Sequence, residues 1–499
     1  MEPNDVLEAQ HSTSTDTEIE TADVEAVNAK AQRPLYESRV KIHPKRARGT
    51  FRKIKWIIMA VTLGIYYGVP WIRWDRGPYL PDQAVLVDIP ERRFFFFFIE
   101  IWPQEFYFAA GLLILAALVL FLVTSVAGRV WCGYSCPQTV WTDLMIAVER
   151  WVEGDRASRL RLDKAPMTGS KLRKRVLKHA IWLLIALFTG GAWVFYFGDA
   201  PTLLVDLVTG NGPYVAYTTI AILTASTYLL GGLAREQVCT YMCPWPRIQG
   251  AMLDDQSLMV SYREWRGEPR GHRRKDQSWD ERGDCIDCKQ CVVVCPMGID
   301  IREGPQLECI NCALCIDACN EIMTKIDRPP NLIAYDSFQG LEAAAKGESS
   351  KVSLIRPRTI IYASLIAVVG LIMLAALVMQ TQLELSVLRD RNPLFVKLAD
   401  GSIRNGYSLR LLNKSYGPID IDLSINGLPG ATISVLGHDG TTVNVLPDDV
   451  SSIRVFVTLP ADQAAKTGDS VRNVDFIARQ KDSDLTTRHA STFRLPEKR

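Results

Sequence analysis

The stretch 285–319 reads CIDCKQCVVVCPMGIDIREGPQLECINCALCIDAC and contains the same cysteine pattern twice. In each copy, three cysteines are spaced three residues apart and a fourth follows four residues later. A cubane cluster needs four converging thiolates, and in two-cluster ferredoxins the fourth ligand of each cluster comes from the other copy. The spacing therefore predicts two [4Fe–4S] clusters, one on Cys285, Cys288, Cys291 and Cys319 and the other on Cys309, Cys312, Cys315 and Cys295.

Zinc and disulfides explain this pattern less well. Zinc sites usually pair two Cys-x2-Cys units over a longer gap, and a disulfide framework conflicts with a reducing cytoplasm, where we place this segment below. One departure from the ferredoxin pattern is Asn320, which follows Cys319 where a proline is usual. We expect it to alter the local turn and not to remove a cluster.

The near-neutral composition conceals unlike parts. The chain has 499 residues and a net charge of +2, but residues 1–32 are acidic and polar while other windows are almost wholly apolar. A wholly soluble protein and a fully embedded transporter are both excluded, and so is covalent c-type haem, because no Cys-x-x-Cys-His occurs. We expect five parts: a disordered acidic tail (1–35), a membrane domain with four spans (36–257), a ferredoxin domain (258–345), a fifth span (346–385) and an outer domain (386–499).

Five windows are long and apolar enough to cross a hydrocarbon core of roughly 30 Å as helices: 54–72, 106–127, 180–197, 214–234 and 359–379. The run Phe94–Phe98 is too short to span and is interpreted as interfacial or as a plain apolar patch. Lys and Arg gather before the first span and between the second and third spans, which predicts that these regions are cytoplasmic. The N-terminus and the ferredoxin domain then face the cytoplasm and the C-terminal domain faces the opposite side. No cleavable signal peptide is expected.

Four cysteines lie beside the spans, in WCGYSCP (Cys132 and Cys136) and VCTYMCP (Cys239 and Cys243). Spacing i, i+4 puts two side chains on one helix face, and the proline after each pair biases the second cysteine toward a non-helical conformation. Both motifs follow a span, so the chain contains a weak internal repeat. We expect the four thiols to converge on a soft metal, either Cu(I), zinc or another iron–sulfur cluster. Additional thioether ligands could come from Met145, Met242 and Met252, although each is more often core filling.

The C-terminal part alternates apolar and polar residues over short stretches such as 408–412, 419–425 and 452–459, separated by turn signals such as Asn426-Gly427. This pattern predicts an immunoglobulin-like β-sandwich. It contains no cysteine, and His438 and His489 are isolated, so we expect a domain for partner contact or shielding.

Together, the ferredoxin segment, the paired Cys-x3-Cys-Pro motifs and the C-terminal sandwich resemble the cytochrome c oxidase accessory protein family, called CcoG, FixG or RdxA. The similarity covers nearly the whole chain after about residue 35. It implies a multi-domain α+β protein of a bacterial inner membrane that reduces Cu(II) to Cu(I) for assembly of cbb3-type cytochrome c oxidase. Copper would bind Cys132, Cys136, Cys239 and Cys243, the electron donor would be cytoplasmic, and partners would include membrane lipid, oxidase subunits or copper chaperones and transporters. No nucleic-acid partner is expected.

Two other functions remain open. The chain could relay electrons from quinol or the cytoplasm to a periplasmic respiratory reductase. Against this, such a relay must cross the bilayer, and the spans contain no pair of histidines for a b-type haem; only His179 approaches a span. A non-redox assembly scaffold is the third possibility, but it gives the eight ferredoxin cysteines no task.

Overall fold

The computed structural model describes residues 21–27, 41–78, 80–272, 279, 282–348, 353–415, 417–438, 440–446, 449–466, 470–481, 483 and 485–496. Most of the expected acidic tail, residues 1–20 and 28–35, lies outside this part. The chain divides into two compact units, Met1–Ile72 with Gln83–Met373 and Arg73–Asp82 with Leu374–Arg499. The expected membrane and ferredoxin domains therefore belong to one unit, and the reason lies in the contacts between them.

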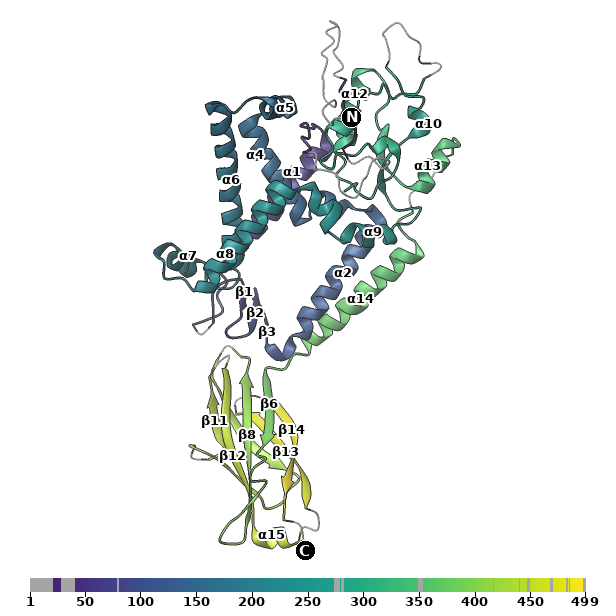
Figure 1. Ribbon diagram of the computed structural model, residues 1–499. Coiled ribbons are helices and arrows are strands. Elements are labelled where there is room, and N and C mark those ends of the chain that lie inside the picture. Colours follow the sequence, from purple (N-terminus) through teal and green to yellow (C-terminus); the bar gives the residue numbers. More distant parts are fainter. Residues whose placement is uncertain are drawn as a thin grey trace. The chain divides into compact units, whose positions relative to one another are not determined.

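Within the described residues, five helices are long and apolar enough to cross a membrane, which confirms the five predicted spans. They are α1 (Thr50–Gly68, extended to Trp71 by the 3-10 turn η1), α2 (Tyr107–Ala127), α6 (Gly169–Val194), α8 (Tyr214–Ser226) with the π-helix η3 (Thr227–Ala234), and α14 (Pro357–Val378). Helices α2 and α14 run side by side (Figure 1) and pack closely, because a Cβ on Gly111 would lie only 2.6 Å from Met373 Sδ.

The segments between the spans form shorter elements. They comprise a three-stranded antiparallel sheet of β1 (Val85–Asp88), β2 (Arg93–Phe96) and β3 (Ile99–Ile101), followed by α3 (Val130–Tyr134), α4 (Pro137–Glu153), α5 (Arg156–Lys164), α7 (Ala200–Thr209), the π-helix η4 (Val238–Met242) and α9 (Trp245–Met252). The phenylalanine run at 94–98 thus forms part of a strand, and Phe95 is buried while Phe98 is exposed.

The ferredoxin repeat folds around two short helices, α11 (Gln290–Val293) and α12 (Leu314–Lys325), next to an antiparallel strand pair, β4 (Met259–Tyr262) and β5 (Ile333–Asp336). The remaining helices of this region are α10 (Glu264–Gly267) and α13 (Phe338–Ala345). Apolar side chains from the strands and from α12 form its core together with the cysteines, and Ile316, Leu332 and Ile333 are almost completely buried.

The repeat is joined to the first span through Asp317 of α12. Its carboxylate accepts hydrogen bonds from the backbone N–H groups of Phe51 (3.2 Å) and Arg52 (2.7 Å) at the start of α1. A carboxylate at a helix N-terminus satisfies unpaired N–H groups and interacts favourably with the helix dipole. Nearby, the N–H of Lys45 donates to the carbonyl of Val293 at 2.9 Å. These contacts hold the ferredoxin repeat against the membrane helices in a single unit.

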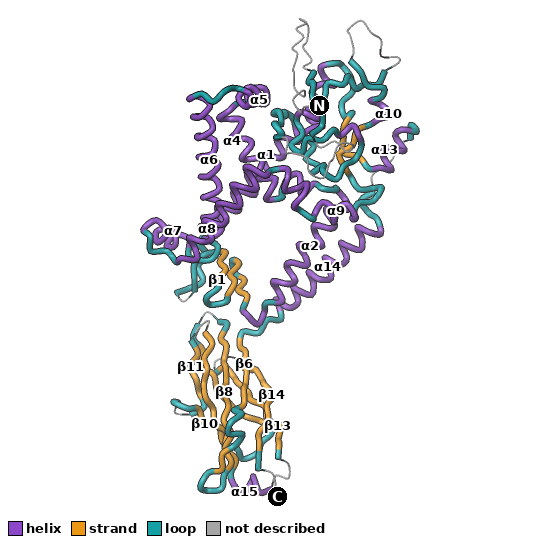
Figure 2. Tube along the Cα trace, in the orientation of Figure 1, coloured by secondary structure: helices purple, strands orange, loops and turns teal. Residues whose placement is uncertain are grey.

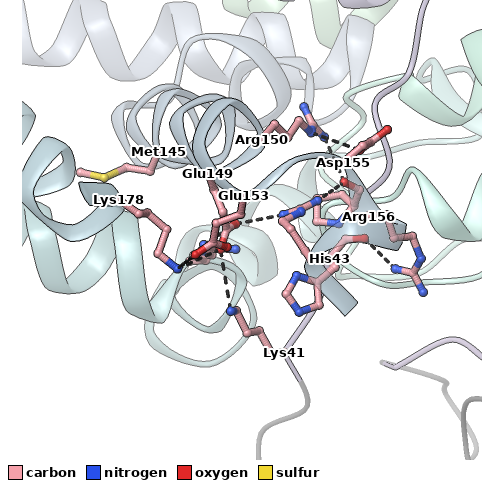
Figure 3. Close-up of polar contacts among 12 residues, drawn as sticks. Lys41, His43, Met145, Glu149, Arg150, Glu153, Asp155, Arg156 and Lys178 are labelled. Atoms are coloured by element: carbon pink, nitrogen blue, oxygen red, sulfur yellow. Dashed lines mark hydrogen bonds and ion pairs between the residues drawn. The ribbon is translucent and has the colours of Figure 1, made fainter. Parts of the chain in front are cut away.

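A buried ion network around Glu149 holds the connecting helices α4 and α5 against the span α6 (Figure 3). Glu149 Oε2 accepts from Arg159 at 2.9 Å and from Arg235 at 2.8 Å. Lys178 of α6 lies 2.9 Å from Glu153 Oε1 and 3.5 Å from Glu149 Oε1. Burial raises the pKa of Glu149, but the surrounding cations outweigh it and lower that pKa to about 2. The carboxylate therefore stays ionised in the fold.

The C-terminal unit is a β-sandwich (Figure 2), which confirms the predicted fold. One sheet has the order β10-β12-β8-β6 with β7 beside β8, and the other has the order β11-β9-β13-β14. The strands are β6 (Leu383–Arg389), β7 (Val396–Lys397), β8 (Ile403–Asn413), β9 (Ile419–Asn426), β10 (Thr432–Val435), β11 (Thr442–Val445), β12 (Asp449–Leu459), β13 (Val471–Gln480) and β14 (Thr486–Arg494), and α15 (Ala461–Lys466) joins two of them. Tyr407 and Phe476 meet edge to face in the core. His438 is exposed and His489 half-buried.

Candidate functional site

The ferredoxin repeat encloses two cavities, and each is lined by the four cysteines that the spacing assigns to it. The first has an empty volume of about 350 Å³. Its cysteines are Cys285, Cys288, Cys291 and Cys319. The backbone N–H of Ala22 donates to the carbonyl of Cys288 at 3.2 Å, and Val24 and Ala26 pack on the core beside it. Residues 21–27, which the composition placed in a disordered tail, thus lie against this cavity.

The second cavity is of similar size, about 370 Å³. Its cysteines are Cys295, Cys309, Cys312 and Cys315. Cys291 borders this cavity as well as the first, so the two cavities share a wall. The remaining lining is apolar and includes Val260, Met297 and Ile299. A water-poor shell of this kind is the usual surrounding of a buried redox group.

Helix α12 explains why the fourth cysteine of the second copy, Cys319, lines the cavity of the first copy. Cys315 in its first turn lines the second cavity, while Cys319, one turn later, lines the first. Both copies also have two left-handed residues at matching positions, two and four residues after the first cysteine. These are Asp287 (φ 51°) and Lys289 (φ 53°) in the first copy and Asn311 (φ 54°) and Ala313 (φ 57°) in the second. The equal turns wrap each loop around its cavity.

The donor set fits two iron–sulfur clusters. Burial raises the pKa of the ferredoxin thiols, to about 12 for Cys295 and Cys319 and to about 11 for Cys309. Grouped thiols of this kind, shielded from water, are suited to a cationic metal cluster that takes up their negative charge. No group of three or more His, Cys, Asp or Glu side chains in the described residues is arranged to hold a single metal ion. Each cavity brings together four cysteines, the number of thiolate ligands that a [4Fe–4S] cluster takes.

The two Cys-x3-Cys-Pro motifs end in the same kind of turn. The offset is 107 residues, from Cys132 to Cys239 and from Cys136 to Cys243. The N–H of Cys136 donates to the carbonyl of Trp131 at 2.9 Å, and the N–H of Cys243 donates to that of Val238 at 2.8 Å, so each closes an i to i+5 turn.

The backbone corrects one expectation about these motifs. Neither cysteine pair lies on a regular α-helix, because the first spans the break between α3 and α4 and the second ends the π-helix η4. Single π turns are frequent at functional sites. The expected effect of the prolines is confirmed, since Cys136 (ψ 130°) and Cys243 (ψ 122°) both leave the helical region.

The four membrane thiols lie near one another. Burial raises the pKa of Cys239 to about 12, and the thiols of Cys136, Cys132 and Cys243 add to this rise. Exposure differs across the group, because Cys132 is buried and Cys243 is exposed. Cys132 Sγ donates to Oε1 of the buried Gln249 at 3.1 Å.

The three methionines considered as possible thioether ligands differ in their exposure. Met145 is completely buried in the core, Met252 is half-buried, and Met242, next to Cys243, is 64% exposed. Met242 is thus the methionine best placed to meet a metal ion arriving from solution.

The first motif packs directly on the second cavity. A Cβ on Gly133 would lie 2.6 Å from the carbonyl oxygen of Ile310 and 3.0 Å from the backbone nitrogen of Cys312, so only glycine allows this approach. Cys132 and Cys312 belong to one buried cluster, with Cys239 and Trp245 packed on it. The membrane thiols therefore lie beside the second set of ferredoxin cysteines.

Sequence reasoning found every cysteine of these sites but missed the residues that join them. Asp317, Gly133 and Gln249 act through contacts with segments far away in the chain, and no local pattern marks them. Arg129 lies three residues before Cys132, and nothing in the local sequence indicates its contact with the carbonyl of Cys309.

Comparison with known proteins agrees with this site. Family models match residues 234–338 as a 4Fe-4S dicluster domain, 109–154 as a 4Fe-4S binding domain and 373–496 as the IG-like fold at the C-terminus of FixG. The chain is 52% identical to the nitrogen fixation protein FixG of Rhizobium meliloti, over 97% of this chain and 99% of that protein. It is 56% identical to protein RdxB (80% and 87% covered) and 53% identical to protein RdxA (87% and 92% covered) of Cereibacter sphaeroides. This protein is therefore a membrane-associated iron–sulfur electron-transfer protein that belongs to the FixG/RdxA family.

Proposed function

We propose that this protein is a cupric reductase of a bacterial inner membrane. It accepts electrons from a cytoplasmic donor and uses them to reduce Cu(II) to Cu(I) for the assembly of cbb3-type cytochrome c oxidase. The observation that carries this proposal is the packing of the first Cys-x3-Cys-Pro motif on the second ferredoxin cavity, where Gly133 touches the backbone of Cys312. A soft metal held by these thiols lies next to a redox centre.

The two cysteine sets of the ferredoxin repeat hold two [4Fe–4S] clusters in this proposal. When bound, such clusters supply one-electron transfer. The chain's own part is to fix two ligand sets on either side of Cys291 and to surround them with apolar side chains. Asp317, by holding α12 against α1, keeps the second set at the membrane motifs.

Copper is the substrate, and its site is formed by Cys132, Cys136, Cys239 and Cys243. Each Cu(II) ion takes up one electron and leaves as Cu(I), the oxidation state that soft thiolates prefer. The exposed Cys243 and Met242 offer an approach from solution, while the buried Cys132 lies on the side of the ferredoxin repeat.

The proposed orientation in the membrane and the proposed partners of the protein rest on the charge of its segments and on its domain structure. The basic segments before α1 and between α2 and α6 favour a cytoplasmic location for the ferredoxin repeat. The C-terminal sandwich then lies in the periplasm, where its surface contacts oxidase subunits or the copper chaperones and transporters that supply them. The spans contact membrane lipid.

The test uses the full chain, purified without oxygen and reduced with dithionite. Cu(II) is added after the excess reductant has been removed, and Cu(I) is followed with a chromogenic Cu(I) chelator. We expect the double variant Cys132→Ser/Cys239→Ser to keep its iron content and EPR spectrum and to lose at least about nine-tenths of the Cu(I) formed. An unchanged rate in this variant would refute the copper site.

The same preparation distinguishes the relay to a periplasmic reductase. Both functions predict about eight iron atoms per chain, as expected for two [4Fe–4S] clusters. A copper-reducing protein also binds copper at the four thiols, whereas a relay takes up no copper. Metal analysis after incubation with Cu(I) and gel filtration separates the two functions.

A further inference from the structure

Arg129 is a buried cation between the two metal sites. It follows Gly128, which has φ 59°, and directly precedes α3, where Cys132 lies. Its side chain is 5% exposed. One guanidinium nitrogen, Nη1, donates to the carbonyl oxygens of Leu307 and of Cys309, the latter at 2.9 Å. Arg129 thus reaches from the membrane motif to the loop that begins the second cysteine set.

The guanidinium also acts on the membrane thiols. Burial raises the pKa of Cys132, and the positive charge of Arg129 opposes that rise. Its charge has the same direction at Cys239 and at Cys309. One cation therefore faces cysteines of both proposed metal sites.

Arg129 differs from other buried arginines in its partners. Others have a carboxylate partner: Arg52 pairs with Asp143, Arg159 with Glu149, and Arg302 with Asp300. Within the part of the chain that the structure describes, no carboxylate lies within ion-pair distance of Arg129, and its Nε is buried without a hydrogen-bond partner. Burying an unpaired cation costs several kcal/mol, so buried charges are normally paired or stand next to metal groups of opposite charge.

We infer that Arg129 is a positioning residue whose counter-charges are the anionic thiolate groups of the second ferredoxin cysteine set and of the copper site. This inference rests on the proposed function for its copper side and on the four-cysteine cavity for its other side. Four thiolates around an iron cluster carry a net negative charge that grows by one on reduction. A fixed cation stabilises the reduced form more than the oxidised form and so raises the reduction potential. On the copper side, the same fixed cation attracts the negative charge of metal-bound thiolates.

The test measures reduction potentials by EPR-monitored redox titration of the full chain without copper. We expect Arg129→Gln to shift one of the two cluster potentials to a more negative value and to leave the other in place. The matched control is Arg302→Gln, because Arg302 lines only the first cavity and pairs with Asp300 and Asp287. Arg302→Gln should shift the potential of the cluster that Arg129→Gln leaves unchanged. Arg129→Lys keeps the charge, so its cluster potentials should stay close to those of the native protein.

Competition with a Cu(I) chelator gives the second readout. Arg129→Gln should weaken Cu(I) binding by about tenfold, because the thiolates lose the attraction of a nearby buried cation. If Arg129→Gln does not retain both clusters, Arg129→Lys decides the question. A lysine variant with full iron content and a near-native potential supports the role of the charge. A lysine variant that also loses iron overturns the inference. An unchanged potential in Arg129→Gln with intact clusters overturns the inference as well. Absence of copper reduction in the native protein would refute the proposed function but leave the potential shift to be measured.

Discussion

The first Cys-x3-Cys-Pro motif packs on the ferredoxin repeat, whereas the second approaches the Glu149 network through Arg235, which lies four residues before Cys239. The residue after each span has an unusual conformation with positive φ, Gly128 with φ 59° and ψ −131° and Arg235 with φ 46° and ψ −113°. Similar turns thus carry different side chains, because the first half continues with Arg129 and the second with Glu236. The paired Cys-x3-Cys-Pro motifs supply the four thiols. Because the side chains around the two motifs differ, one side of the site faces the ferredoxin cysteines and the other faces solution.

The largest effect should come from removing the charge that anchors the second motif. Glu149→Gln leaves Arg159 and Arg235 without their carboxylate in a buried place, and we expect the free energy of unfolding to fall by about 3–5 kcal/mol. Denaturant unfolding in detergent measures this. The control is Glu321→Gln, because Glu321 forms an exposed pair with Lys325 that should contribute less than about 1 kcal/mol. Equal effects of the two variants would contradict the network's role.

Disturbing the contact of the first motif should have the next largest effect. Gly133→Val places a side chain against the backbone of Ile310 and Cys312, which should cost about 1–3 kcal/mol by overpacking and displace the second cysteine set. Iron analysis and EPR should show one cluster lost or altered. The matching position in the second motif is Thr240, and Thr240→Val should keep both clusters. Equal iron contents and EPR spectra in the two valine variants would contradict the expected difference between the two motifs.

The pH dependence of stability should reveal the ionised Glu149. Its pKa in the fold is lowered to about 2 from the ordinary 4.5, so its stabilising effect is complete above pH 4.5 and is lost as the pH falls toward 2. The difference in unfolding free energy between the native protein and Glu149→Gln should therefore narrow by about 2 kcal/mol between pH 7 and pH 3. A constant difference over this range would show that Glu149 is not ionised in the fold.

The smallest effect should come from the hydrogen bonds behind Cys132. Gln249 accepts from Cys132 Sγ at 3.1 Å and donates to Thr124 Oγ1 at 3.2 Å. Gln249→Leu should lower the free energy of unfolding by about 1 kcal/mol. Thr142, at the matching position of the first half, is half-buried, and Thr142→Val should have a smaller effect. The reverse order, measured by thermal unfolding, would contradict the stronger burial of the first motif.

The sequence by itself determined the parts of this protein. Spacing alone assigned the eight ferredoxin cysteines to two sets, because a cubane requires a fixed short-range ligand pattern. Apolar windows of span length located the five helices, and alternation of apolar and polar residues located the sandwich. Each of these signals is local, so it can be read along the chain.

Only the tertiary structure decided how the parts meet. Three contacts join residues more than 170 positions apart: the carboxylate of Asp317 with the start of α1, the close approach at Gly133, and the hydrogen bond from Arg129 to the carbonyl of Cys309. Such contacts depend on which surfaces pack together, and no periodicity encodes that choice. The tertiary structure also showed that part of the acidic tail lies on the first cavity and that the membrane cysteines end in i to i+5 turns. The ligands were readable from the chain, but their proximity came from packing.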